Sequence, residues 1–149
     1  MNTLKICLLT CTLSFICIIS YSQGARAIQG YWWNQERTSK IKIELKDGVY
    51  NGTIVYMTPE TFENGAPPRD SKNPNPALRN RSIQGIQIIH NLEYNPNTRR
   101  WENGSIYDPR SGNTYSCYVW LEGDVLKIKG HLRGIRWIGR ESEWYKTTP

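Results

Sequence analysis

From residue 28 onward, apolar residues recur at every second position, and turn-forming residues interrupt them at short intervals. An alternation of period two is typical of a β-strand with one buried face. The clearest case is residues 40–45, in which Ile41, Ile43 and Leu45 share one face. Asp47-Gly48 follows, a pair that favours a tight hairpin turn. The pattern therefore predicts a hairpin between this strand and residues 49–57.

The same pattern extends over the rest of the chain. The predicted strands are 28–33, 40–45, 49–57, 86–94, 101–107, 115–121, 126–132 and 138–144. Parity groups three sets of residues on one face each: 86, 88, 90, 92 and 94; 126, 128, 130 and 132; and 138, 140, 142 and 144. No segment predicts an amphipathic helix of ten residues.

Eight strands joined mostly as hairpins predict an all-β, antiparallel up-and-down barrel with one long loop. Closure removes the two exposed edges that an open meander would leave, and eight strands either fill such a barrel or leave room for one small ligand. The alternative is an open two-sheet sandwich.

The first residues predict a secretory signal peptide. Lys5 precedes an apolar run at residues 6–19, and small polar residues follow it. The run is shorter than the roughly 20 residues that a membrane-spanning helix needs. We place the signal peptide at 1–22 and one barrel domain at 23–149, with Ala25-Arg26-Ala27 as a second cleavage candidate and a lipid-modified cysteine as an alternative. The mature protein is expected to be exported, either periplasmic or extracellular.

Removal of the signal peptide leaves Cys117 as the one cysteine, so no internal disulfide is expected. The formal net charge is +6 for the whole chain and falls by one with Lys5. The basic residues are scattered over strands and turns, whereas a nucleic-acid site gathers them on one face. We therefore expect a solvated outer face and no nucleic-acid partner, while peripheral contact with an anionic envelope surface stays open. The sequence gives no indication of an oligomeric state.

The two ends of the barrel domain resemble the calycin pattern. Gly30 and Trp32 form a Gly-x-Trp at the first strand, and Arg140 stands in the last. In lipocalins and their relatives, such an arginine lies over the indole at the closed end of the barrel. The resemblance implies a cation–π contact between Arg140 and Trp32.

A second resemblance covers nearly the whole domain. The chain is similar to the domain of unknown function 2147 family, which consists of small exported bacterial proteins. The matching residues are Gly30, Trp32, Asp70, Asn73, Pro74, Pro76, Leu78, Arg79, Arg81, Gly85, Trp101, Gly104, Ile106, Tyr107, Asp108, Pro109, Gly112, Tyr115, Ser116, Cys117, Leu126, Gly130, Gly139, Arg140 and Trp144. The resemblance implies a lipocalin-like barrel and no particular activity. Residues 130–134 depart from the family's usual Gly-Tyr-Ile-Gly.

The long segment 58–82 carries the candidate site. The charged residues that match the family are Asp70, Arg79 and Arg81 in this segment, and Asp108 and Arg140 outside it. One hypothesis is a tie, in which Arg79 or Arg81 pairs with Asp70 or Asp108 and pins the loop to the barrel. The other is a clamp, in which these arginines face the barrel mouth and bind an anionic group, with Tyr107 and Tyr115 beside them.

Aromatic residues are the second candidate feature, because they suit a cavity for an apolar ligand. Those that could line one are Tyr50, Tyr56, Trp101, Tyr107, Tyr115 and Trp137. Neither histidine, His90 or His131, has ligand-type neighbours in sequence, so we expect no metal site and no cofactor. Asn73 and Asn75 are interpreted as turn formers around Pro74 and Pro76.

Two functions follow from these features. The first is a binding module for a small amphipathic or anionic ligand, with an aromatic interior and an arginine for the head group. The second is a cell-envelope protein-interaction module with a filled barrel, which uses the rim residues His131, Arg133 and Arg136. An enzyme is not expected, because no nucleophile, base and orienting group can be assembled; Asp70 or Asp108 would be its acid or base.

Overall fold

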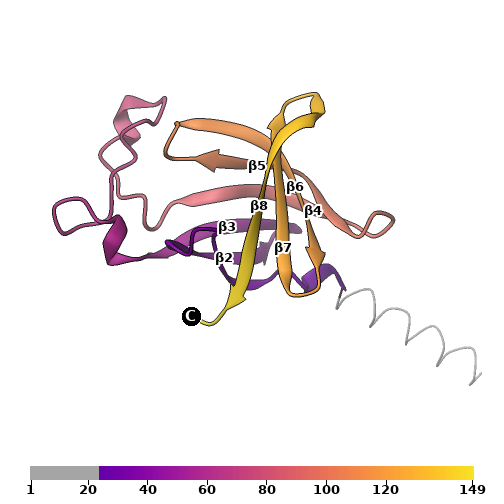
Figure 1. The fold of residues 1–149 in the computed structure, drawn as a ribbon. Coiled ribbons are helices and arrows are strands. Elements are labelled where there is room, and N and C mark those ends of the chain that lie inside the picture. Colours follow the sequence, from indigo (N-terminus) through magenta and orange to yellow (C-terminus); the bar gives the residue numbers. More distant parts are fainter. Residues whose placement is uncertain (1–23) are drawn as a thin grey trace, which may run out of the picture.

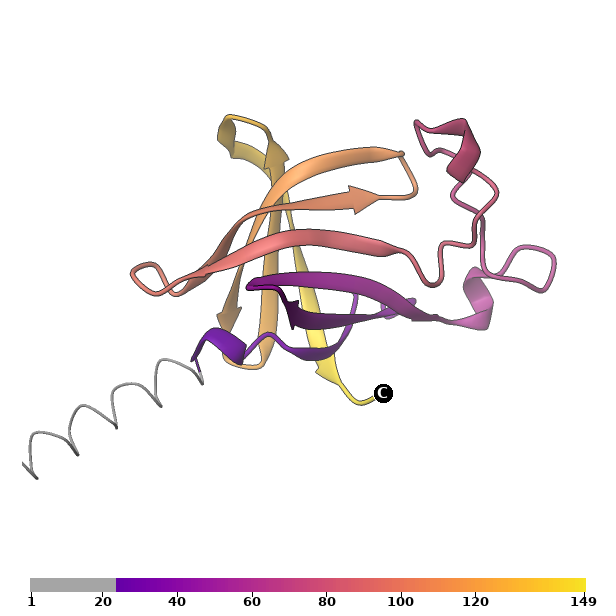
Figure 2. The same ribbon diagram turned by 180° about the vertical axis from the view of Figure 1, so that it is seen from behind.

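The computed structural model describes residues 24–149. Eight strands pair in chain order, all antiparallel, and β1 also pairs with β8, which closes the barrel (Figures 1 and 2). The strands are β1 (Gly30–Trp33), β2 (Ser39–Lys46), β3 (Val49–Met57), β4 (Gln87–Asn95), β5 (Arg100–Asp108), β6 (Asn113–Glu122), β7 (Val125–Leu132) and β8 (Ile135–Thr147). Two short 3₁₀ helices, η1 (Pro59–Thr61) and η2 (Pro76–Leu78), lie in the long loop between β3 and β4.

The predicted closed barrel is confirmed, and the two-sheet sandwich is excluded. The predicted strand 49–57 coincides with β3, and Asp47 and Gly48 take the positive φ angles of +52° and +83° in the β2–β3 turn. The predicted signal peptide lies outside the described residues. Within residues 24–149, the structure contains no helix with the length and apolar character needed to cross a membrane.

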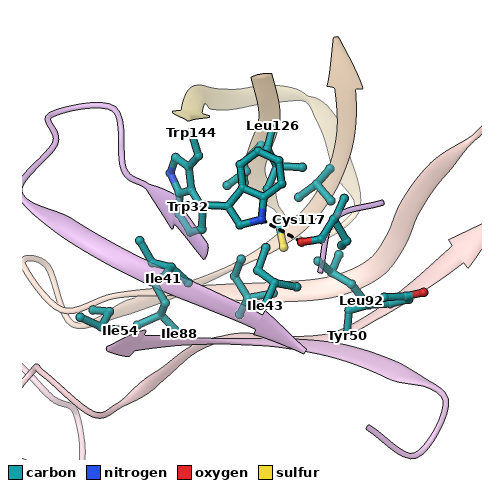
Figure 3. Close-up of a cluster of buried hydrophobic side chains, with 14 of the residues drawn as sticks. Trp32, Ile41, Ile43, Tyr50, Ile54, Ile88, Leu92, Cys117, Leu126 and Trp144 are labelled. Carbon is teal, nitrogen blue, oxygen red and sulfur yellow. Dashed lines mark hydrogen bonds between the residues drawn. The ribbon is translucent and has the colours of Figure 1, made fainter. Parts of the chain in front are cut away.

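The centre of the barrel is packed with apolar side chains (Figure 3). Trp32 is 1% exposed, and its Nε1 donates to the Ile28 carbonyl at 2.8 Å. The largest fully buried side chains around it are Ile41, Ile43, Ile89, Leu92, Cys117, Val119, Leu126 and Ile128. Their burial is the main favourable contribution to folding, because each removes apolar surface from water. Side chains of the chain itself thus occupy the middle of the barrel.

The segment before β1 packs across one end of the barrel. The Ala25 carbonyl accepts from the Tyr50 hydroxyl at 2.5 Å and from Trp101 Nε1 at 3.0 Å, so it satisfies two aromatic side chains of the core. Ile28, a few residues on, has no exposed surface. This end is therefore closed by main chain as well as by side chains.

The strict alternation predicted for two strands is wrong. In β4, Asn91 adopts a left-handed φ of +57° and the pairing with β3 is irregular, so Ile88 and Ile89 are both buried. In β7, the register shifts after His131, which is 6% exposed, whereas Leu132 is 50% exposed. Such irregularities insert extra residues into one strand of a pair, so residues beyond them can face the opposite side of the sheet. Between β7 and β8 the extra residues are 136–138 of β8.

The last strand and the tryptophan signature also differ from expectation. Of the face predicted for residues 138, 140, 142 and 144, only Trp144 is buried, because β8 runs beyond the core at its start. The cation over the Trp32 ring is Lys146, with Nζ 5.6 Å from the ring centroid. Arg140 is exposed and lies opposite Gly130 in the β7–β8 ladder, so the expected contact between Arg140 and Trp32 is not formed.

Candidate functional site

Asp70 anchors the long loop to the barrel wall. Its carboxylate has no exposed surface; Oδ1 accepts from the Tyr107 hydroxyl at 2.5 Å, and Oδ2 accepts from Asn73 Nδ2 at 2.8 Å. Arg81 donates to the same Oδ2, from Nε at 3.0 Å and from Nη2 at 2.9 Å. We call Asp70, Asn73, Arg81 and Tyr107 the loop latch. It joins the β3–β4 loop to β5 through charge-assisted hydrogen bonds.

Main-chain contacts hold the same loop closed. The Asp70 N–H donates to the Arg81 carbonyl at 3.0 Å, and the Ile83 N–H donates to the Pro68 carbonyl at 2.8 Å. The β5–β6 turn presses against the loop from the other side: a Cβ atom added at Gly112 would stand 2.0 Å from the Lys72 carbonyl oxygen. The loop is thus ordered by contacts with the turn beside it as well as by the latch.

The latch geometry agrees with the tie hypothesis for Asp70 and Arg81, because the two side chains pair with each other and not with an open barrel mouth. Both oxygens of the Asp70 carboxylate accept hydrogen bonds from protein donors, and the group is shielded from solvent. Burial, followed by the hydrogen bond to Asp70, raises the pKa of Tyr107 to about 12, so this side chain stays a hydrogen-bond donor at neutral pH. A ligand would have to displace these partners to reach the carboxylate.

The other predicted site residues are spread around the loop and the barrel. Arg79 Nε donates to the Asn73 carbonyl at 2.8 Å, which places it beside the latch. Asp108 instead holds its own turn, accepting from the Arg110 N–H at 3.1 Å and from Ser111 Oγ at 3.0 Å. Tyr115 is half-buried opposite Ile106, and Arg140 lies on β8 away from the latch. The structure therefore brings Asp70, Arg79, Arg81 and Tyr107 together, whereas Asp108 bonds within its own turn and Tyr115 and Arg140 lie on β6 and β8.

The aromatic residues do not form one lining. Tyr50, Trp101 and Tyr107 are buried, but Trp137 is 78% exposed and Tyr56 is 41% exposed. The predicted aromatic cavity is therefore wrong for those two residues. Among residues 24–149, no three histidine, cysteine, aspartate or glutamate side chains gather closely enough to hold a metal ion.

A separate cleft lies on the outer wall of the barrel, beneath the β7–β8 hairpin. Its volume is about 360 Å³, and it is lined by Asn103, Gly104, Ser116, Cys117, His131, Gly134 and Arg136. We call it the hairpin cleft. Ser116 and His131 are register partners on the face opposite buried Cys117, which puts their side chains outside the barrel. The β7–β8 hairpin that carries Gly134 and Arg136 has its tip at the top of Figure 1.

The polar groups of the hairpin cleft are donors or can act as donors. Arg136 is held against the wall with its guanidinium carbon 5.9 Å from the Tyr118 ring centroid, and it forms no ion pair within residues 24–149. Ser116 adds a hydroxyl to the lining, and the Asn103 amide nitrogen donates to Glu93 Oε2 at 3.1 Å. No acidic side chain is part of the lining itself. The cleft suits an anion more than a cation.

Sequence reasoning missed Asn103 and Ser116 as site residues. The interpretation of Asn73 as a turn former is confirmed, because Asn73 Oδ1 accepts from the Asn75 N–H at 2.9 Å, but the additional role of Asn73 in the latch was not predicted. One signal was available for Asn103: Asn-Gly inside a predicted strand is unusual, because both residues favour turns. In the structure, Asn103 has a φ of +61°, and β5 contains one more residue than β6 between the pairs Trp101–Val119 and Gly104–Cys117, which is a β-bulge. This bulge sits at the wall of the cleft.

Cys117 is expected to be inert in the folded protein. It is 2% exposed, and burial raises the pKa of its thiol from 9.0 to about 12. Since the thiolate is the nucleophile, this rise leaves very little reactive sulfur at pH 8. With residues 23–149, iodoacetamide at pH 8 should leave the intact mass unchanged in native buffer and add one adduct in denaturant. Rapid labelling of the native protein would show that the cleft admits reagents to the sulfur.

Comparisons with known proteins agree with this architecture. The family profile described as "uncharacterized protein conserved in bacteria (DUF2147)" matches residues 30–146. Among solved structures, protein HP1028 from the human pathogen Helicobacter pylori, described as belonging to the lipocalin family, superimposes with a TM-score of 0.70 at 21% identity, covering 81% of this chain and 83% of its own. None of the curated proteins matches the sequence.

Proposed function

This chain belongs to the DUF2147 family and has a lipocalin-like barrel, and from the hairpin cleft we propose that it is an exported binding module for a small organic carboxylate. The carrying observation is a cleft of about 360 Å³ whose polar lining comes from Asn103, Ser116, His131 and Arg136 without any acidic side chain. Ligand pockets commonly enclose about 300–1,000 Å³, so a small molecule fits this one.

The packed interior supports this location. Trp32, Ile43 and Leu92 occupy the middle of the barrel, where a ligand of a hollow barrel would otherwise lie. Arg81, one candidate for the head group, is engaged by Asp70 in the loop latch. Arg136 lines the cleft without an acid partner among residues 24–149, so its charge is available to a carboxylate. A guanidinium matches a carboxylate well, because two N–H groups can face its two oxygens.

Chemical-shift mapping tests this proposal. Residues 23–149, labelled with ¹⁵N, are titrated with octanoate, citrate and inorganic phosphate as probes. At least one carboxylate is expected to move the amide signals of Gly104, Ser116 and Gly134 together. Arg136→Gln should weaken that binding about tenfold or more, because it removes a charged hydrogen bond.

Arg133→Gln provides the matched control, since Arg133 lies in the same hairpin but does not line the cleft. It removes the same charge and should weaken binding less than twofold. The proposal is wrong if no probe moves the cleft signals, or if the two variants lose affinity equally. Preferential binding of phosphate would show that the cleft binds a different class of anion from the proposed carboxylate.

A further inference from the structure

The tip of the β7–β8 hairpin exposes an apolar surface. Among residues 24–149, the exposed large hydrophobic side chains include Leu132, Trp137 and Ile138 from this one hairpin, at 50%, 78% and 54%. Burying such side chains is favourable, and an exposed apolar group of this kind commonly marks an interaction site. The tip lies at the outer edge of the barrel, at the top of Figure 1, so a partner can approach it from outside.

Positive charge is interleaved with these apolar residues. Arg133 and Arg136 lie between Leu132 and Trp137, and Arg140 follows, with no acidic residue from 131 to 140. None of the three arginines forms an ion pair within the described part of the chain. The nearest carboxylate in sequence, Glu141, is already paired with Lys129 Nζ at 3.2 Å. The tip thus combines uncompensated positive charge with exposed apolar surface.

We propose that the β7–β8 tip, residues 132–138, docks onto an anionic lipid bilayer. The charge complementarity carries this choice of partner: each arginine near an anionic surface gains from its negative potential. Tryptophan prefers the boundary between head groups and acyl chains, and Ile138 and Leu132 can enter the apolar layer beside it. Arginine side chains reach outward to the phosphates while their stems cover apolar surface.

The geometry of the hairpin allows such shallow insertion. The turn is short, from the end of β7 at Leu132 to the start of β8 at Ile135, and Gly134 takes a φ of +83° in it. The β7–β8 ladder pairs Leu132 with Ile135 at the turn and His131 with Gly139 further along, and residues 136–138 of β8 have no partner in this register. Insertion is therefore expected to be shallow, with the main chain of residues 136–138 at the level of the lipid head groups rather than in the hydrocarbon, where unpaired peptide groups are costly.

Vesicle flotation tests the docking. Residues 23–149 are used, because the apolar run at 6–19 would itself enter vesicles, and the vesicles contain either phosphatidylcholine alone or phosphatidylcholine with 30% phosphatidylglycerol. The protein should float with the anionic vesicles and stay in solution with the neutral ones. Trp137→Ser with Ile138→Ser should lower partitioning at least tenfold, and Arg133→Gln should lower it about fivefold.

Matched controls distinguish an effect of the tip from non-specific effects of net charge and exposed apolar surface. Lys72→Gln removes one exposed positive charge from the loop, and Tyr56→Ser removes an exposed aromatic from β3. Each should change partitioning less than twofold. The docking is overturned if the protein floats with neither vesicle, or if the controls lose as much as the tip variants. A photo-crosslinker at residue 137 that captures a protein in intact cells, without flotation, would assign the tip to a protein partner.

Gly134 and Arg136 belong both to the tip and to the hairpin cleft, so the variants of Trp137 and Ile138 are the ones that distinguish docking from carboxylate binding. Trp137 and Ile138 do not line the hairpin cleft. Their replacement should abolish flotation and leave the octanoate or citrate titration unchanged. If no carboxylate binds in the titration but the protein still floats with anionic vesicles, only the ligand proposal is contradicted.

Discussion

Asp70→Asn should destabilise the protein by about 2–4 kcal/mol. The amide that replaces the carboxylate would turn an N–H₂ donor toward a group that also donates: Tyr107, Asn73 or Arg81. Removing one partner of a buried ion pair commonly costs about 3–5 kcal/mol. The expected loss of stability is smaller here, because the Arg81 side chain is 38% exposed and can be hydrated when its partner is removed. Urea unfolding of residues 23–149, followed by tryptophan fluorescence, measures the free energy of unfolding.

Glu141→Gln is the matched control for this variant. It also removes one carboxylate from an ion pair, but the Glu141 side chain is 56% exposed where it meets Lys129. Exposed pairs contribute about 0–1 kcal/mol, so the control should be almost neutral. Equal effects from the two variants would contradict the latch. Amide hydrogen exchange should show the loss of protection at residues 70–83 first, because the loop is attached at few points.

Gly112→Ala should also destabilise the protein, by about 2–5 kcal/mol. Two costs add: Gly112 has a φ of +74°, and its new Cβ would stand 2.0 Å from the Lys72 carbonyl oxygen. A left-handed conformation costs a non-glycine residue about 1–2 kcal/mol, and an overpacked contact costs about 1–3 kcal/mol more. Since the clash is with main chain, the loop has to move as a whole. The same urea titration measures the effect.

Gly123→Ala separates the two costs. Gly123 has a φ of +59° in the β6–β7 turn, but nothing lies within 4 Å of the position its Cβ would take. This variant should lose only the conformational share, about 1 kcal/mol. The double variant Asp70→Asn with Gly112→Ala should lose less than the sum of the two, because both displace the same loop. Full additivity would show that latch and turn support the loop independently.

The strands were predictable because a half-buried strand repeats every two residues. The alternation of Ile41, Ile43 and Leu45 is a local property of the sequence, and the structure buries Ile41 and Ile43 as expected. Bulges were not predictable from that rule. Asn91 and Asn103 take left-handed conformations in the middle of strands, and the register change after His131 depends on how β8 curls. These features are set by pairing between strands rather than by periodicity within one.

The candidate site shows the same division. The two charged residues of the latch, Asp70 and Arg81, could be named from the sequence of the long loop. Which arginine pairs with which carboxylate could be seen only in the structure. Tyr107 and Asn73 join them through tertiary packing, which no local pattern encodes. The hairpin cleft was hidden further, because Asn103, Ser116 and Arg136 come from three segments that meet only when the hairpin folds back on the wall. The assignment of Arg140 to the Trp32 ring came from family resemblance, and Lys146 occupies that place.

The pairing of β1 with β8 has a consequence for how the chain folds. Tyr31 pairs with Thr147, and Trp33 pairs with Tyr145, so the contact that closes the ring joins residues more than a hundred positions apart. Contacts of such long sequence separation form slowly, because loop entropy must be lost before any energy is gained. Until the last strand arrives, the outer edges of β1 and β7 stay available to other chains. A protein of this topology needs protection between its synthesis and its final closure.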